Sequence, residues 1–140
     1  MNKLNINVER VFNAEIAKVY DAFADAEKMS KWFYATGEGG SSQIESDFKE
    51  GGRYHICMIR ASGETHDHSG IYTKIVPNKE IFFTWNSEMV QDTEVQITLE
   101  SISEGTRVKL THVSMPEGEP AEMHTVGWNA ILELWEQQSS

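Results

Sequence analysis

The fold of this chain is decided by AEMHTVGWNAIL at residues 121–132, a helix-like segment near its end. A second helical stretch lies near the start, at residues 13–23, and a shorter one follows at residues 27–33. Between them, from about residue 48 to residue 113, apolar residues alternate with polar ones, as in strands that bury one face. A sheet built from this middle part needs one face covered, and the two ends supply the helices.

Six strands are expected, and tight turns separate several of them. They are predicted at residues 5–11, 54–59, 66–76, 81–85, 94–100 and 108–112. Asn13 is expected to cap the first helix and Pro120 to begin the last, whereas the Gly- and Ser-rich residues 36–42 indicate a loop. This order predicts an α+β fold in which a curved antiparallel sheet wraps around a long carboxy-terminal helix, with two short helices after the first strand.

Length and charge limit the classes of function. At 140 residues the chain is expected to form one domain, residues 1–140. A net charge of −10, with no cluster of Lys and Arg, argues against nucleic acid as a partner. No apolar run approaches a membrane span, so membrane insertion is not expected. The first residues lack the apolar core of a signal peptide, and the single cysteine, Cys57, agrees with a reducing compartment, so a cytoplasmic location is expected.

The last helix carries apolar residues over more than half of its circumference. One stripe, expected to face the core, contains Met123, Val126, Gly127, Ala130, Ile131 and Leu134, and an adjacent side contains Trp128, Leu132 and Trp135. Such a helix is either deeply buried or shared with a partner. Gly127 has two explanations: close approach of helix and sheet, or space left for another molecule.

The residues expected on the inner surface are unusually large and aromatic. They are Trp32, Phe33, Tyr54, Met58, Tyr72, Phe83 and Trp85. They can simply fill the core, or they can line an apolar pocket that has a few polar groups. Both interpretations are open from the sequence.

Histidines are the main candidates for chemistry. His66 and His68 fall on one face of a strand, and His112 has the inward parity of another, so the three could hold zinc if their strands were neighbours. A lone His112 that hydrogen-bonds a ligand in a pocket is the favoured interpretation, and neither a metal nor a cofactor is expected. Cys57 has no evident activating base and is expected to be an apolar filler. No motif here specifies catalysis.

Several segments together resemble a known family. They are VERVFNA (8–14), VYDAFADAEKMSKWF (19–33), GGRY (51–54), GIYTKIVP (70–77), FTW (83–85), LTH (110–112) and GWNAIL (127–132). In this order they resemble the START-like (SRPBCC) superfamily, and more narrowly the family related to the carboxy-terminal domain of the activator of the heat-shock-protein-90 ATPase. The resemblance implies a helix-grip fold with a hydrophobic cavity between sheet and last helix. Because that family includes co-chaperone domains, ligand-binding proteins and an antibiotic-resistance protein, it implies no single activity.

The leading hypothesis is a non-enzymatic protein that binds a small hydrophobic or aromatic molecule in this cavity. The residues expected to line it are Trp32, Tyr54, Met58, Tyr72, Phe83, Trp85, His112, Met123 and Gly127. The alternative is a stress-related, co-chaperone-like interaction module, with a chaperone partner or a homodimer formed through Trp128 and Trp135. A weaker alternative is a hydrolase or cyclase of the same superfamily that uses His112.

Overall fold

The computed structural model describes residues 3–34 and 39–139 of the chain. The elements, in order, are β1 (Lys3–Phe12), α1 (Ile16–Ala24), α2 (Ala26–Met29), β2 (Ser41–Ser46), β3 (Arg53–Ile59), β4 (Thr65–Val76), β5 (Glu80–Ser87), β6 (Thr93–Ile102), β7 (Gly105–Pro116) and α3 (Glu119–Ser139). The predicted α+β order, with two short helices after the first strand and a long last helix, is confirmed.

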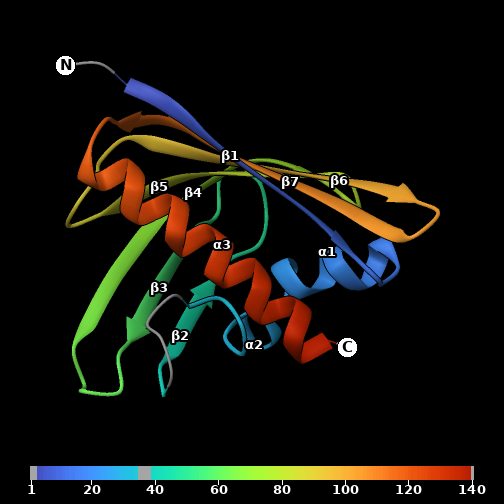
Figure 1. The fold of residues 1–140 in the computed structure, drawn as a ribbon, viewed down its shortest axis with the longest axis horizontal. Coiled ribbons are helices and arrows are strands. Elements are labelled where there is room, and N and C mark those ends of the chain that lie inside the picture. Colours follow the sequence, from blue (N-terminus) through green and yellow to red (C-terminus); the bar gives the residue numbers. More distant parts are fainter. Residues whose placement is uncertain (1–2, 35–38, 140) are drawn as a thin grey trace.

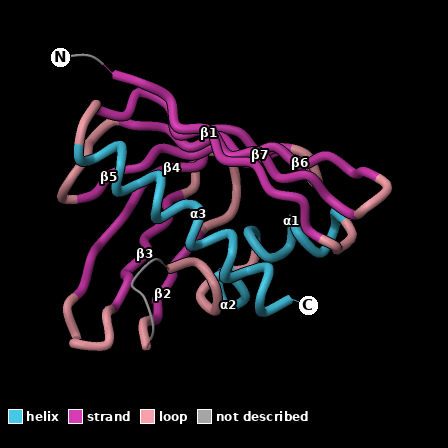
Figure 2. The backbone as a smooth tube through the Cα atoms, in the orientation of Figure 1, coloured by secondary structure: helices cyan, strands magenta, loops and turns pink. Residues whose placement is uncertain are grey.

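The strands form one curved antiparallel sheet in the order β1-β7-β6-β5-β4-β3-β2. Irregularities in the register occur between Leu4 and Ile6 in β1 and between Tyr72 and Lys74 in β4. Such bulges bend a strand and increase its twist. Figures 1 and 2 show the sheet curving around α3, so the helix-grip arrangement is confirmed.

The face of α3 that enters the core differs from the prediction. The buried residues are Ala121, Trp128, Ile131, Leu132 and Trp135, all less than 9% exposed. By contrast, Met123 is 48% exposed and Val126 is 70% exposed, so the stripe expected to face the core lies largely outside it. The large tryptophans occupy the buried side because burying them removes more apolar surface from water than burying valine or alanine. Trp128 and Trp135 are therefore buried within the chain, and the prediction of a dimer contact through these two side chains is wrong.

Two local predictions are corrected. The cap of α1 is Glu15, whose side chain makes no capping bond, whereas Asp25 caps α2 by accepting hydrogen bonds from the backbone N–H groups of Glu27 and Lys28. Of the loop predicted at residues 36–42, residues 36–38 lie outside the described residues, and residues 41–42 belong to β2. Pro120 is the second residue of α3, as expected for a helix start.

Candidate ligand-binding cavity

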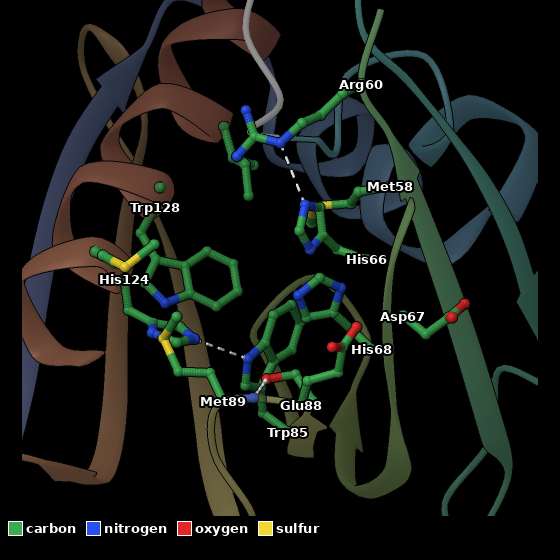
Figure 3. Close-up of a pocket in the computed structure, with 14 residues that line it drawn as sticks. Met58, Arg60, His66, Asp67, His68, Trp85, Glu88, Met89, His124 and Trp128 are labelled. Atoms are coloured by element: carbon green, nitrogen blue, oxygen red, sulfur yellow. Dashed lines mark hydrogen bonds between the residues drawn. The ribbon is translucent and has the colours of Figure 1, made fainter. Parts of the chain in front are cut away.

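A partly open cavity of about 440 Å³ lies between the amino-terminal half of α3 and strands β3, β4 and β5. Its wall consists of Met58, Arg60, His66, Asp67, His68, Trp85, Ser87, Glu88, Met89, Met123, His124, Gly127, Trp128 and Ile131. Figure 3 shows Trp85, Trp128, His68 and His124 grouped around this space. The volume lies in the range of small-molecule sites, and the wall combines mainly apolar surface with polar and charged side chains.

The local structure explains why these residues meet. On α3, His124 is followed at three, four and seven residues by Gly127, Trp128 and Ile131. This spacing places the four residues on one side of the helix. On β4 the side chains alternate between the two faces of the sheet. Asp67 bonds His55 across β3 at 2.9 Å (Oδ1 to Nε2), whereas its neighbour His68 packs against Trp85.

Trp85 is the centre of the wall. Its ring centroid lies 4.9 Å from that of Trp128 and 4.7 Å from that of His68, whose plane is tilted by 34°. Its indole N–H donates to His124 Nε2 at 3.3 Å, and His124 Nδ1 lies 2.8 Å from the Pro120 carbonyl. Because Nε2 accepts, Nδ1 carries the proton, and His124 is therefore a neutral imidazole with both nitrogens occupied.

A second hydrogen-bonded chain lies behind the wall and centres on His112. Trp128 Nε1–H donates to His112 Nδ1 at 3.0 Å, and His112 Nε2 lies 2.8 Å from Thr93 Oγ1. Because the Thr93 hydroxyl donates to the Trp85 carbonyl at 2.7 Å, it accepts from His112. His112 is completely buried, and burial lowers its pKa to about 3, with a smaller contribution from His124. This histidine is neutral and fully satisfied, and its role is to fix the positions of the two tryptophans.

His68 has the opposite character. It lines the cavity, and its Nδ1 is buried without a hydrogen-bond partner within the described residues. Burial lowers the pKa of His68 to about 4, with His124 acting in the same direction and a hydrogen bond with the Ile56 backbone acting in the opposite one. A neutral imidazole with one unpaired nitrogen, Nδ1, therefore lies in the cavity wall.

The rim of the cavity is polar at one end and rich in methionine at the other. Arg60 Nε donates to His66 Nε2 at 3.2 Å and lies 3.8 Å from a Glu64 carboxylate oxygen, so its charge is partly compensated. Met89, which lies near His124 (Figure 3), is 44% exposed, and Met123, the residue before His124, is 48% exposed. Flexible thioethers adapt to irregular apolar partners, which suits an entrance for a hydrophobic molecule.

The structure brings four of the nine predicted binding residues to this cavity. They are Met58, Trp85, Met123 and Gly127. Three others, Tyr54, Tyr72 and Phe83, pack against one another elsewhere, with ring centroids 5.3–6.0 Å apart, around a space of only about 10 Å³. That space is at the lower limit for one water molecule. The half of the sheet–helix interior near α1 and α2, called here the packed half of the grip, is therefore filled by side chains.

The remaining two predicted residues are also core residues. Trp32 is 3% exposed, and its indole N–H donates to the Ala22 carbonyl at 3.3 Å. Its ring packs edge-on against Phe23, with the centroids 4.9 Å apart. His112 lies behind the wall, as described above. The aromatic inner surface thus has both of the roles that the sequence left open: it fills the half of the grip near α1 and α2 and lines a cavity in the other half.

Sequence reasoning missed several lining residues, above all His68 and His124. His68 shares the inward parity of Tyr72, which had been assigned to the inner surface, so that parity was the available signal. His124 lies three residues before Gly127 and four before Trp128, which places it on their side of the helix. The sequence instead predicted that the side with Met123 and Val126 faces the core, so His124 was not among the predicted lining residues. Within the described residues no three His, Cys, Asp or Glu side chains form a metal-binding group, and no helix there is long and apolar enough to cross a membrane.

The fold and cavity define the class of protein: an α+β helix-grip protein with a half-open space between sheet and last helix. Residues 13–137 match the model of the Activator of Hsp90 ATPase homolog 1-like protein family, and the chain belongs to that family. This confirms the resemblance to START-like proteins. A search of curated proteins finds no match to the sequence.

Solved structures agree with this assignment. A Chromobacterium violaceum protein has 30% identity and a TM-score of 0.85, with 95% of each chain covered. An AHSA1 protein of Silicibacter pomeroyi shares the fold at 21% identity and a TM-score of 0.83, with 97% of each chain covered. The Aha1 dimer of Colwellia psychrerythraea shares it at 23% identity and a TM-score of 0.74, covering 96% of this chain and 94% of that one.

Proposed function

We propose that this protein binds a small hydrophobic or aromatic molecule in the cavity between α3 and strands β3, β4 and β5. The observation that carries the proposal is the half-open volume of about 440 Å³ with Trp85, Trp128 and two neutral histidines in its wall. An apolar molecule that enters it leaves water and gains contact with ring faces and thioethers. The adjacent half of the grip is packed without such a space, so the cavity is a local feature.

The geometry gives no support to catalysis by His112. A general base must reach a substrate proton directly or through one water molecule. His112 is completely buried, has both nitrogens engaged and is absent from the cavity wall. Binding without chemistry is therefore the function that the arrangement supports best.

Filling the cavity from α3 is expected to abolish binding. In Gly127→Phe the new side chain would lie on the helix side shared by His124 and Ile131, which lines the cavity. We expect the affinity for N-phenyl-1-naphthylamine, a neutral aromatic fluorophore, to fall by about tenfold or more, since the probe and the phenyl ring compete for the same volume. Fluorescence titration measures this.

The matched control is Glu133→Phe, an exposed position on the same helix that does not line the cavity. It adds the same ring and is expected to leave the affinity unchanged. If the wild-type protein does not enhance the fluorescence of the probe, or if both variants lose binding equally, the proposed cavity is not the binding site.

A homodimer is a second candidate, favoured by the exposed apolar residues Met89, Met123 and Val126, of which the last two lie on α3. Clustered apolar exposure of this kind often marks an interaction surface. We expect Val126→Glu to convert a dimer to a monomer in sedimentation velocity, because burying an unpaired charge at an interface is unfavourable. A wild-type protein that sediments as a monomer at high concentration would rule out this candidate.

A further inference from the structure

We propose that His68 is the polar anchor of the cavity and that the natural ligand is a planar aromatic molecule with a hydroxyl group placed to hydrogen-bond this imidazole. The inference rests on the proposed ligand-binding function and adds to it the chemical class of the ligand. It is carried by the contrast between His68 and the other hydrogen-bonding rings around the cavity.

Those other rings already have partners inside the protein. Trp85 bonds His124, which also meets the Pro120 carbonyl, and Trp128 bonds His112. His66, on the rim, accepts from Arg60. None of these groups has to find a partner in a ligand.

Among these rings, only His68 has a buried nitrogen, Nδ1, without a hydrogen-bond partner in the described part of the chain. Buried polar groups in folded proteins nearly always have a partner, so an unpaired one calls for an explanation. A ligand that supplies the partner is such an explanation, because His68 is in the wall and its ring faces the cavity over Trp85 (Figure 3).

The shape of the ligand follows from the rings around His68. The His68 and Trp85 planes are tilted by only 34° at a centroid distance of 4.7 Å, and Trp128 lies 4.9 Å from Trp85. Flat aromatic faces and edges favour a flat aromatic partner. A hydroxyl group suits the imidazole whichever nitrogen holds the proton, because a hydroxyl both donates and accepts.

The test compares naphthalene, 1-naphthol and 1-methoxynaphthalene, three probes of the same ring system, by calorimetric titration. Wild-type protein is expected to bind 1-naphthol about tenfold more tightly than naphthalene, the gain of one hydrogen bond to an otherwise unpaired group. 1-Methoxynaphthalene, which accepts but cannot donate, shows whether His68 acts as the acceptor: it then binds like naphthalene, and otherwise like naphthol.

Three variants localise the effect. His68→Leu is expected to keep naphthalene binding and lose the preference for naphthol, while His68→Gln, which can still hydrogen-bond, retains most of it. His55→Leu, at an exposed position of β3 that does not line the cavity, is the matched control and retains the whole preference. Urea midpoints of all three variants confirm that they are folded.

Two results would overturn the assignment of His68. One is equal affinity of the wild-type protein for naphthalene and naphthol, and the other is a naphthol preference that survives in His68→Leu. Either result leaves the proposed function intact if naphthalene binds. Absence of binding by every probe would overturn the proposed function and this inference together.

Discussion

Replacing His112 with leucine is expected to lower the free energy of unfolding by about 3 kcal/mol. The substitution removes the acceptor of the Trp128 indole N–H and the donor to Thr93 Oγ1, at a position that is completely buried. Leucine fills a similar volume but offers no hydrogen bond, so the Trp128 N–H is left unpaired in the core. Urea denaturation followed by tryptophan fluorescence measures the change.

The neighbouring residue Thr111 provides the control. Its hydroxyl donates to Asn7 on the exposed face of the sheet, with 3.0 Å between Oγ1 and Oδ1. Thr111→Val removes a hydrogen bond that water can replace, and it should change the free energy of unfolding by less than about 0.5 kcal/mol. A loss below about 1 kcal/mol in His112→Leu would show that the buried chain from Trp128 to Thr93 does not hold the cavity wall in place.

The sheet was largely predictable because alternation is a strong and local signal. In β6 the apolar residues Val95, Ile97 and Leu99 occupy every second position, and all three are buried. β2 has only Ile44 as a large apolar residue among Ser, Gln and Glu, so no alternation marks it. It is an edge strand that is defined by its pairing with β3, which a local pattern cannot reveal.

The orientation of α3 was not predictable for a related reason. When apolar residues cover more than half of a helix, periodicity shows that the helix is buried but not which side faces the sheet. Met123 and Val126 fit the helical period as well as Trp128 and Ile131 do, and packing of the tryptophans decides between them. Because the buried side of α3 was predicted wrongly, the sequence did not show which residues surround Gly127 in the cavity wall.

The division of the grip into a packed half and an open half is a property of three-dimensional packing. Tyr54 and Trp85 have the same apparent character in the sequence, yet the first lies in the filled half and the second beside the cavity. Tyr54 directs its hydroxyl to the Thr84 carbonyl at 2.6 Å, which satisfies it without a ligand. Only the partners of each polar group distinguish structural residues from binding residues here.

Acid is expected to destabilise this protein from pH 6.5 downward, well above the range in which carboxylates normally protonate. Burial lowers the pKa of His68 to about 4 and that of His112 to about 3, and it also lowers the pKa of His124. In the unfolded chain a histidine has a pKa near 6.5. Below that pH the unfolded state binds protons that the folded state excludes, so stability is complete above about pH 7 and declines as the pH falls toward the folded-state values.

The magnitude follows from the pKa values of His68 and His112 in the folded state. Each of His68 and His112 contributes a loss of about 2 kcal/mol between pH 7.5 and pH 5, or about 4 kcal/mol together, and His124 adds to the loss. The groups that bear on His68 are His124 and His66, which oppose its protonation, and Asp67, which favours it. Protonation of His68 in the folded state would place a positive charge in a buried site against Trp85, where the cost of burial exceeds the attraction of Asp67.

Urea denaturation at a series of pH values tests this, with His68→Leu as the matched variant. Leucine cannot bind a proton in either state, so the loss between pH 7.5 and pH 5 should shrink by about 2 kcal/mol relative to wild type. Every carboxylate is common to both proteins and cancels in the comparison. Equal losses in the two proteins would mean that His68 keeps an ordinary pKa near 6.5 in the folded state, and the conclusion that burial keeps this imidazole neutral at pH 5 would then be wrong.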